Sequence, residues 1–287
     1  MESYPLVSVL MTAYNREQYI AEAIESVLAS SYTNFELIVV DDGSVDDTIA
    51  IVKKYLAIDQ RIQLYINEKN LGDYPNRNKA ASFAKGKYLM YCDSDDLFLE
   101  NSISYCTNAM ELYPQCGIGM YSAQNKPEAF VMPAKDNVQH HFFKNPILNI
   151  GPGGTIILRS FFLAIDGYPV FYGPANDMYF NLIVCCKTPI LFLPKPFLYY
   201  RIHPGQEKNN EYSYIHYNYR YLSDAFLFLE LGLNKKDILY LNNKNKRRFV
   251  VNLYRSYLKT KSILSTIQLW KNADFRFRDL IRGIFHI

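Results

Sequence analysis

Three aspartates lie within four positions at residues 93–96, where the sequence reads YLMYCDSDDLF over 88–98. Like charges packed this closely repel each other, so Asp93, Asp95 and Asp96 need a neighbour that offsets their charge. A hard divalent cation such as Mg²⁺ or Mn²⁺, held together with a bound diphosphate, would do so, because these cations prefer oxygen ligands. The alternative is a solvated acidic turn or a helix N-cap. The apolar segment directly before the aspartates favours the ligand site.

A second acidic pair follows the apolar segment FELIVV at 35–40. In a nucleotide-binding sheet, an acid such as Asp41 or Asp42 at a strand end can accept hydrogen bonds from a ribose or a base. The alternative is that both residues shape the turn, with Ser44 and Asp47 spaced as a capping box for the next helix. The two interpretations are compatible if each aspartate has one of the two tasks.

The segment Thr12–Asn15 ends the first expected strand, and no glycine occurs before Gly43. A dinucleotide-binding Rossmann fold carries Gly-x-Gly-x-x-Gly at this place, and a P-loop is also rich in glycine. The sequence therefore argues against NAD, FAD and a P-loop, and against nucleotidyltransferases that use a glycine-rich loop after their first strand. Tyr14 offers a ring that could stack on a base instead.

Three further residues carry a chemical and a structural interpretation each. Arg77, in PNRNKA, could reach a phosphate or a base, or form a surface ion pair. Asp177, in PANDMYFNLIV, could act as a general base or complement the dipole of the helix that it opens. His203, in YYRIHPGQ, could contact a metal or a phosphate, or be structural. Gly153 and Gly154, in GPGGT, would let the chain approach a ligand closely.

An alternation of strands and helices over the first 125 or so residues must position these side chains. Short apolar segments predict strands and segments with helical apolar spacing predict helices. This alternation indicates an α/β fold with a mostly parallel, doubly wound sheet, whose ligands lie at the carboxyl ends of the strands. The expected strands are 6–11, 35–40, 61–66, 87–92 and 118–123. The expected helices are 16–30, a helix opened by the capping box at Ser44 and continued over 49–57, the end of 70–86, and 100–113.

The rest of the chain is different in character. Residues 126–205 are expected to be irregular and are rich in Pro, Gly and aromatic residues, and 211–287 are expected to form a helical appendage that is amphipathic and basic. We predict one domain over 1–210, with a nucleotide-binding half at 1–125 and an acceptor half at 126–210. The basic appendage would contact an anionic membrane surface, or pack on the catalytic domain or on a second subunit as in a homodimer.

Composition sets broad limits. The 287 residues carry a net charge of only +3, which does not indicate a nucleic-acid partner. The five cysteines are odd in number and include no Cys-x-x-Cys, which favours a reduced, cytoplasmic setting. MESYPLVSVL lacks the basic and long apolar segments of a signal peptide, and no apolar run reaches the length of a membrane span, so we expect neither.

Taken in order, three stretches resemble the inverting glycosyltransferases of family 2, which have the Rossmann-like GT-A fold. These stretches are VSVLMTAYNREQYIAEAIESVL, FELIVVDDGSVDDT and NLGDYPNRNKAASFAKGKYLMYCDSDD. The resemblance is strong over about residues 5–125, weaker over 150–205 and negligible after 210.

The resemblance implies a role for each matching position. Asp177 falls where the family places its catalytic base. Asp95, Asp96 and His203 would ligate Mn²⁺ or Mg²⁺. The nucleotide pocket would be formed by Thr12, Ala13, Tyr14, Asn15, Asp42, Arg77, Asp93, Ser94 and Asp95.

The implied function is transfer of one sugar from a nucleotide-diphosphate sugar, expected to be UDP-linked, to a glycan or lipid-linked acceptor with inversion. Family habit points to bacterial surface polysaccharide or lipopolysaccharide synthesis. Two departures qualify this prediction. Asn176 stands where many members have Glu, and the Gln-x-x-Arg-Trp motif of processive synthases is absent, the only tryptophan being Trp270. A non-catalytic nucleotide-sugar or glycan-binding member, and a sugar-nucleotide hydrolase, remain as alternatives.

Overall fold

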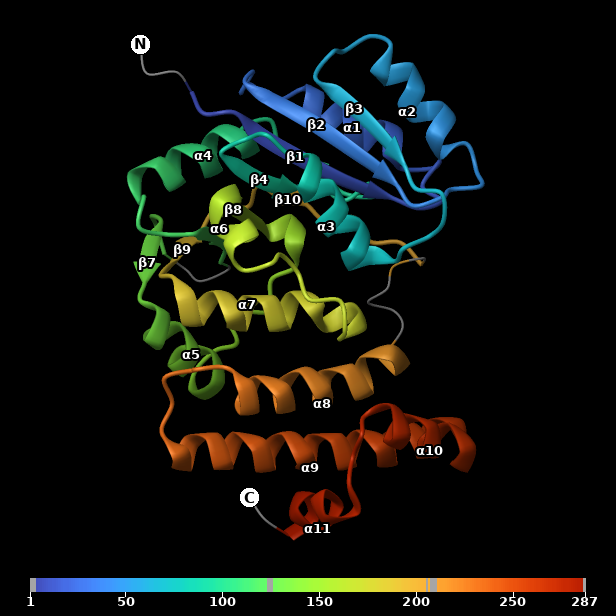
Figure 1. The fold of residues 1–287 in the computed structure, drawn as a ribbon, viewed down its shortest axis with the longest axis vertical. Coiled ribbons are helices and arrows are strands. Elements are labelled where there is room, and N and C mark those ends of the chain that lie inside the picture. The colour runs from blue at the N-terminus through green and yellow to red at the C-terminus, as the bar shows by residue number, and fades with distance from the viewer. Residues whose placement is uncertain (1–3, 123–125, 205, 207–210, 286–287) are drawn as a thin grey trace. The chain divides into compact units, whose positions relative to one another are not determined.

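The computed structural model describes residues 4–122, 126–204, 206 and 211–285, and these form two compact units (Figure 1). All described strands belong to the first unit, whereas the second unit is helical. The predicted boundary at residue 210 falls inside the second unit, which also takes in two earlier segments. The first unit comprises Met1–Pro133, Ile150–Tyr168 and Thr188–Ile202, and the second comprises Ala134–Asn149, Pro169–Lys187 and His203–Ile287.

The first unit is built on an eight-stranded sheet in the order β3-β2-β1-β4-β8-β6-β9-β7. The four strands β3, β2, β1 and β4 are parallel, as predicted. The other half is mixed, because β8 runs antiparallel to both β4 and β6, β9 is parallel to β6, and β7 is antiparallel to β9. The strands are β1 Val7–Ala13, β2 Phe35–Asp41, β3 Ile62–Ile66, β4 Tyr88–Tyr91, β6 Ile118–Tyr121, β7 Phe130–Met132, β8 Thr155–Leu158 and β9 Ile190–Leu193.

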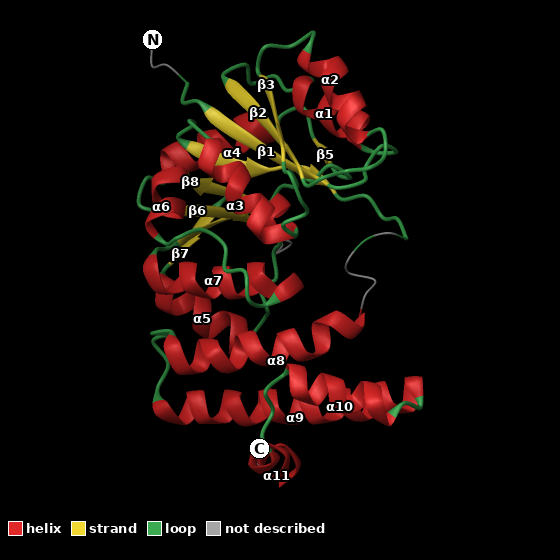
Figure 2. Ribbon diagram, turned by 45° about the vertical axis from the view of Figure 1, so that its right-hand side comes forward, coloured by secondary structure: helices red, strands yellow, loops and turns green. Residues whose placement is uncertain are grey.

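Helices cover both faces of this sheet (Figure 2). Alternate residues of β1 and β2, such as Val9 and Val39, join one core cluster with the buried residues of α1, α2 and α4. Residues of opposite parity face α3, where the ring of Tyr65 on β3 stacks on Phe83 with centroids 3.7 Å apart. The helices of this unit are α1 Ile20–Leu28, α2 Thr48–Leu56, α3 Asp73–Phe83, α4 Ser102–Leu112 and α6 Arg159–Ala164, and a small ribbon pairs β5 Leu97–Phe98 with β10 Leu198–Tyr199.

The first helix shows why the sequence pattern predicts the elements well. Its buried residues Ile20, Ala23, Ile24 and Val27 recur at the spacing of one helical face. The start of α2 differs from the prediction, because no capping box forms there. The hydroxyl of Ser44 donates to Asp41, and the carboxylate of Asp46 accepts the N–H and hydroxyl of Thr48 instead.

The second unit is a set of packed helices, which confirms the helical C-terminal region. Its C-terminal core gathers buried aromatic and aliphatic residues from α8, α9 and α10 and from the segment before α11. None of its described helices, nor any other described helix, combines the length and apolar character that crossing a bilayer requires. The helices are α5 Ala134–Phe143, α7 Asn176–Lys187, α8 Glu211–Phe228, α9 Lys235–Thr260, α10 Ile263–Asn272 and α11 Phe277–Phe285.

Candidate active site

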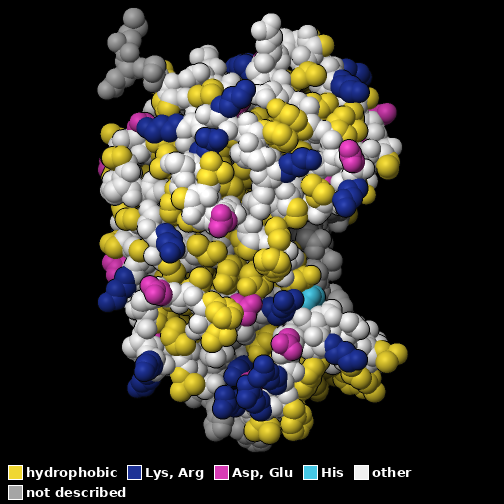
Figure 3. All heavy atoms as spheres, viewed as in Figure 1, with side chains coloured by type: hydrophobic (Ala, Val, Ile, Leu, Met, Phe, Trp, Pro, Cys, Tyr) yellow, Lys and Arg dark blue, Asp and Glu magenta, His cyan; other side chains and the backbone are white. Residues whose placement is uncertain are grey.

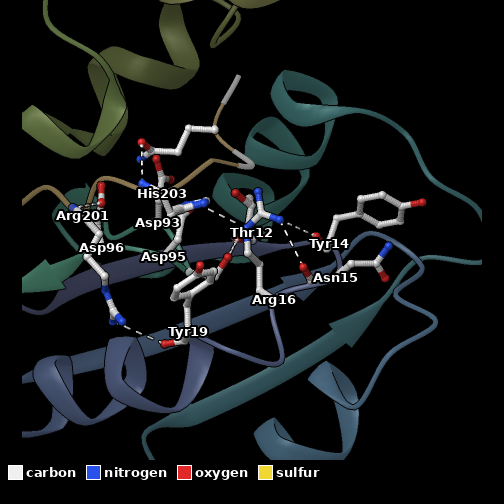
Figure 4. Close-up of polar contacts among 12 residues, drawn as sticks. Thr12, Tyr14, Asn15, Arg16, Tyr19, Asp93, Asp95, Asp96, Arg201 and His203 are labelled. Atoms are coloured by element: carbon white, nitrogen blue, oxygen red, sulfur yellow. Dashed lines mark hydrogen bonds and ion pairs between the residues drawn. The ribbon is translucent and has the colours of Figure 1, made fainter. Parts of the chain in front are cut away.

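The loops that follow β1 and β4 leave the sheet side by side (Figure 4). These two strands are parallel neighbours, with Leu10 paired to Tyr91, so their carboxyl ends meet at one edge. The hydroxyl of Ser94 donates to the carbonyl oxygen of Thr12 at 2.8 Å and ties the loops together. The first unit thereby brings together most of the predicted nucleotide-binding residues, namely Thr12, Ala13, Tyr14, Asn15, Asp93, Ser94 and Asp95.

Each of the three clustered aspartates has a different partner. The carboxylate of Asp93 lies 2.6 Å from Nη1 of Arg77, and that of Asp95 lies 3.3 Å from Nε of Arg16. Asp96 accepts a hydrogen bond of 3.0 Å from the backbone N–H of Arg201. Two arginine side chains and one backbone N–H therefore offset the repulsion among the three carboxylates.

Asp96 is the most buried of the three carboxylates, with 2% of its surface exposed. Burial raises the pKa of Asp96 to about 7, and the nearby charge of Asp93 adds to the effect. An acid with this pKa keeps its proton over much of the mildly acidic range, whereas Asp93 and Asp95 are more open to solvent. The side chains of Asp93 and Asp95 are 26% and 15% exposed, so both can be reached from solution.

The raised pKa of Asp96 predicts a pH-dependent stability. The carboxyl titrates near 7 in the folded chain and near its ordinary 3.8 in the unfolded chain, so the folded state binds its proton more tightly between these values. The free energy of unfolding should fall as pH rises through this window. Thermal denaturation of wild type and Asp96→Asn, without added metal, should show the wild-type Tm falling relative to the variant from pH 5 to pH 8. A constant difference in Tm would contradict the raised pKa.

Arg77 is buried on α3 between two carboxylates. Its Nε lies 2.7 Å from Asp73 and its Nη1 2.6 Å from Asp93, so the alternative of an ion pair is borne out, but with a buried arginine rather than a surface one. Burial acts to lower the pKa of Arg77, but the charges of Asp73 and Asp93 outweigh it and raise the pKa well above its usual value. The arginine holds Asp93 in place, and direct contact with a nucleotide stays a prediction.

Replacing Arg77 by Met should lower the free energy of unfolding by about 3 kcal/mol, because it leaves a carboxylate without its buried partner. Urea denaturation of the two proteins measures this difference. Lys87→Met is the control, since it removes an exposed ion pair with Glu111 and should cost no more than about 1 kcal/mol. An equal loss of unfolding free energy in the two variants would show that the ion pairs of Arg77 contribute no more than an exposed pair does.

Two arginines of this site were not predicted. Nη1 of Arg16 donates to the carbonyl oxygens of Tyr14 and Asn15, both at 3.1 Å, while its Nε meets Asp95. Arg16 thus shapes the β1 loop, whose Asn15 has a positive φ of 53°. Its place directly after the predicted segment is the one signal that could have found it. Arg201 has no such signal, because it meets Asp96 from 105 residues away in the sequence.

The two acidic residues at the end of β2, Asp41 and Asp42, accept hydrogen bonds from different loops. Asp41 shapes the turn, since its carboxylate accepts the N–H groups of Gly43 and Ser44. Asp42 is buried, and its carboxylate accepts the N–H groups of Leu71 and Gly72 and the side-chain amide of Asn67. Asp42 therefore anchors the loop before α3. That its carboxylate also accepts a hydrogen bond from a base stays a prediction. Tyr14 is 45% exposed and free to offer a ring face.

Asp177 and His203 belong to the second unit, and their roles stay predictions. Asp177 lies in the first turn of α7, is 8% exposed and accepts the N–H of Met178 at 2.7 Å. Burial raises the pKa of Tyr221 to about 12, to which the negative charge of Asp177 contributes. His203 donates its backbone N–H to the side-chain oxygen of Gln206.

Asn176, which stands where many family 2 members have Glu, has a structural task. Its side-chain oxygen accepts the N–H of Tyr172 at 2.9 Å, and its amide donates to the carbonyl of Gly173 at 2.6 Å. These bonds fasten the turn η2, Gly173–Ala175, that leads into α7. An amide serves this task better than a carboxylate, because it offers both a donor and an acceptor.

The two glycines of GPGGT are explained by packing within the first unit. A Cβ on Gly154 would lie 2.6 Å from a methyl group of Ile150, and one on Gly153 would lie 2.9 Å from a methyl group of Leu198. Close approach of a sugar to these glycines stays a prediction.

The site fits a hard divalent cation that takes most of its ligands from a substrate. Asp93 and Asp95, each beside an arginine, could offer carboxylate oxygens from the loop after β4, and Mg²⁺ or Mn²⁺ prefers such ligands. Among the residues that the structure describes, no group of three or more His, Cys, Asp or Glu forms a complete metal cage. One or two carboxylates plus phosphate oxygens is the usual arrangement for Mg²⁺ in nucleotide sites.

Solved structures with the same fold include two proteins in complex with a nucleotide sugar. S. aureus TarS 1–349 in complex with UDP-GlcNAc matches 97% of this chain and 81% of its own, with a TM-score of 0.71 and 20% identity. The mannosyltransferase PcManGT from Pyrobaculum calidifontis, in complex with GDP-Man and Mn²⁺, matches 99% and 87%, with a TM-score of 0.61 and 15% identity. At these identities the likeness shows the fold alone, and it confirms the predicted GT-A fold.

Sequence relatives point to the same family. An uncharacterized glycosyltransferase of Haemophilus influenzae is 34% identical over 56% of this chain and 53% of its own. TuaG of Bacillus subtilis, named for teichuronic acid biosynthesis, is 33% identical over 50% and 59%. The chain thus spans little more than half the length of these relatives. The model of glycosyl transferase family 2 matches residues 8–164, which is more than half of the chain. The chain belongs to glycosyl transferase family 2.

Proposed function

We propose that the chain transfers a single sugar from a UDP-sugar to an acceptor hydroxyl with inversion at the anomeric carbon. The observation that carries the proposal is the joined pair of loops after β1 and β4, where Ser94 bonds to Thr12 and Arg16 meets Asp95. Membership of family 2 supports the reaction class. A nucleotide diphosphate brings the negative charge that this edge of the sheet, with a cation, is suited to receive.

The donor side of the reaction would use the residues of the first unit. Asp95 would hold Mg²⁺ or Mn²⁺, with Asp93, kept in place by Arg77, and Asp96 beside it. When bound, the cation supplies positive charge that offsets the charge growing on the diphosphate leaving group. Tyr14 would stack on the base, Asp42 would accept a hydrogen bond from it, and Ser94 would keep the two loops together. His203 would add a contact to the diphosphate or to the cation.

The acceptor side would use the second unit. Asp177 would take the proton from the acceptor hydroxyl while that oxygen bonds to the anomeric carbon and the bond to the diphosphate breaks. Attack from the face opposite the leaving group inverts the configuration. Asp177 is only 8% exposed, so the acceptor hydroxyl would meet it largely shielded from water.

The setting is part of the proposal. We place the reaction in the cytoplasm, since the five cysteines are odd in number and include no Cys-x-x-Cys, which favours a reducing compartment. TuaG, a relative, is named for teichuronic acid biosynthesis, which supports an acceptor in a bacterial surface polysaccharide. Transfer of one sugar per encounter agrees with the absence of a Gln-x-x-Arg-Trp motif from the sequence.

A panel of nucleotides tests the donor. The thermal stability of the protein is measured with UDP, GDP and dTDP, each with and without Mn²⁺. At a concentration of 100 times its Kd, a ligand stabilises the folded state by about 2.7 kcal/mol. We expect a Mn²⁺-dependent rise in Tm with UDP. A rise in Tm with GDP or dTDP alone would show that the donor carries that nucleotide instead of UDP. No rise in Tm with any nucleotide would contradict the proposal.

A second candidate is a non-catalytic member that binds a nucleotide sugar or a glycan. The observation that favours it is Asn176, which removes one carboxylate next to the proposed base and binds the η2 turn instead. Such a protein would show the UDP-dependent rise in Tm but no turnover. Release of UDP from a panel of UDP-sugars with oligosaccharide acceptors distinguishes the two.

A further inference from the structure

The last 53 residues carry a charge opposite in sign to that of the rest of the chain. Residues 235–287 contain thirteen Lys or Arg and three Asp, a net charge of +10. Residues 1–234 contain eighteen Lys or Arg and twenty-five Asp or Glu, a net charge of −7. The small total of +3 therefore hides a strongly basic segment, which is typical of a surface that meets an anionic partner.

Helix α9 has an exposed apolar stripe as well as a buried one. Its inner face packs Phe249 and Leu253 into the helical core. On the outer face, Val251, Tyr254 and Leu258 are all exposed and recur at helical spacing, and Tyr254 is 62% exposed. Basic residues accompany them on the same exposed surface, namely Arg247, Arg255 and Lys259.

Helix α10 repeats this arrangement. Leu269 is fully buried in the core, whereas Ile263, Leu264 and Ile267 are exposed, Leu264 by 80%. The spacing of these three residues puts them on one face together with the exposed Lys271. Helix α10 therefore has an exposed apolar face in addition to the one that it buries.

Helix α11 buries its acid and exposes its apolar residues. The carboxylate of Asp279 is buried and forms an ion pair of 2.8 Å with Lys246 of α9. Phe277, 71% exposed, and Ile281 lie one turn apart on the outside, next to the exposed Arg278 and Arg282. The outer surface of this helix thus combines large apolar side chains with cations and has lost its negative charge.

We propose that this basic-apolar face docks on an anionic lipid membrane. The face is defined by Arg247, Val251, Tyr254, Arg255, Leu258, Ile263, Leu264, Ile267, Lys271, Phe277, Arg278, Ile281 and Arg282. In Figure 3, yellow hydrophobic and dark-blue Lys and Arg side chains lie next to one another over the part of the molecule that Figure 1 labels α9, α10 and α11.

The positive charge of residues 235–287 favours an anionic membrane over a second copy of the chain as the partner of this face. A second copy of the chain would bring one net charge of +10 against another, which opposes association. An anionic bilayer offers complementary charge for the arginines and lysines and an acyl boundary for the leucine, isoleucine and phenylalanine side chains. Long basic side chains can reach the lipid phosphates while their stems and neighbours stay in the apolar layer. The docking is peripheral, with the helices lying in the interface.

Vesicle sedimentation tests the proposal independently of any transferase activity. The protein is mixed at about 0.1 M salt with vesicles of phosphatidylcholine containing about one third phosphatidylglycerol, or of phosphatidylcholine alone. We expect it to sediment with the anionic vesicles, and to be released at about 1 M salt, where charges are screened within about 3 Å. Arg278→Gln with Arg282→Gln should lower the partition coefficient about 30-fold, since each cation near the surface contributes about 1 kcal/mol. Phe277→Ser with Ile281→Ser should lower it about 100-fold.

Matched variants of the first unit serve as controls. Ile58→Ser with Leu112→Ser removes two exposed apolar side chains, and Lys53→Gln with Lys54→Gln removes two exposed cations. Both should sediment as the wild type does. All replaced side chains are exposed, so circular dichroism should show unchanged folding. Failure to bind anionic vesicles, equal binding to neutral vesicles, or an equal loss in the controls would overturn the proposal. Light scattering that shows a dimer dissolved by Phe277→Ser with Ile281→Ser would assign the face to self-association instead.

Discussion

Asp177→Asn should lower the rate of sugar transfer about 1,000-fold while leaving the affinity for UDP nearly unchanged. A positioned general base contributes about 100- to 10,000-fold to a reaction of this kind, and an amide cannot accept the proton. The substitution keeps the shape of the side chain and the hydrogen bond from the N–H of Met178, so the start of α7 should remain intact. Measured turnover with a UDP-sugar, together with the UDP-induced rise in Tm, separates catalysis from binding.

Asp136→Asn is the matched control for this experiment. Asp136 lies in the first turn of α5, as Asp177 does in α7, and both helices belong to the second unit. If Asp177 only complements a helix dipole, the two variants should behave alike and lose no more than about 1 kcal/mol of stability. A large loss of turnover in Asp177→Asn alone supports the base. Loss of UDP binding together with turnover would count against it.

Asp95→Asn should abolish the Mn²⁺-dependent part of UDP binding and lower kcat/KM by about two orders of magnitude or more. The variant removes a charge that would hold the cation, and a bound cation is worth several kcal/mol to a departing diphosphate. It also frees Arg16, whose Nε lies 3.3 Å from Asp95, so some binding of nucleotide without metal should remain. Calorimetric titration with UDP at increasing Mn²⁺ concentration measures both the Mn²⁺-dependent and the Mn²⁺-independent part of UDP binding.

Asp47→Asn provides the comparison, because Asp47 is exposed at the start of α2 and its side chain makes no capping hydrogen bond. It should bind UDP and Mn²⁺ as the wild type does. If Asp95→Asn responds to Mn²⁺ as strongly as the wild type, the cation is held elsewhere, and the assignment of Asp95 as a ligand is wrong.

The parallel half of the fold could be predicted from the sequence because its information is local. Continuous apolar strands such as Phe35–Val40 and the helical spacing of Ile20, Ile24 and Val27 fix element type and order, and parallel pairing then fixes where the strands end. The acidic and polar residues at these ends could thus be assigned to one site. Their partners Arg16 and Arg201 could not, because the pairing depends on side-chain geometry and, for Arg201, on a segment 105 residues away in the sequence.

The strand order of the mixed half of the sheet could not be predicted from the sequence, because it depends on contacts between distant segments. β8 inserts between β4 and β6 although β6 precedes it in the chain, and its register is set by long-range packing rather than by a local turn. The start of α2 shows the same limit on a smaller scale. Several Asp, Ser and Thr residues compete there for the same amides, and tertiary contacts with Asn15 and Glu17 decide which of them caps the helix.

The strand order also has a consequence for how the protein is made. The four parallel strands are complete once residue 91 has been synthesised, but β8, the next neighbour of β4, ends only at residue 158. Until that point the growing chain carries a half-sheet whose β4 edge lacks its partner, and such edges are sites of aggregation. Truncated chains that end before β8 should therefore aggregate more readily than chains that include it.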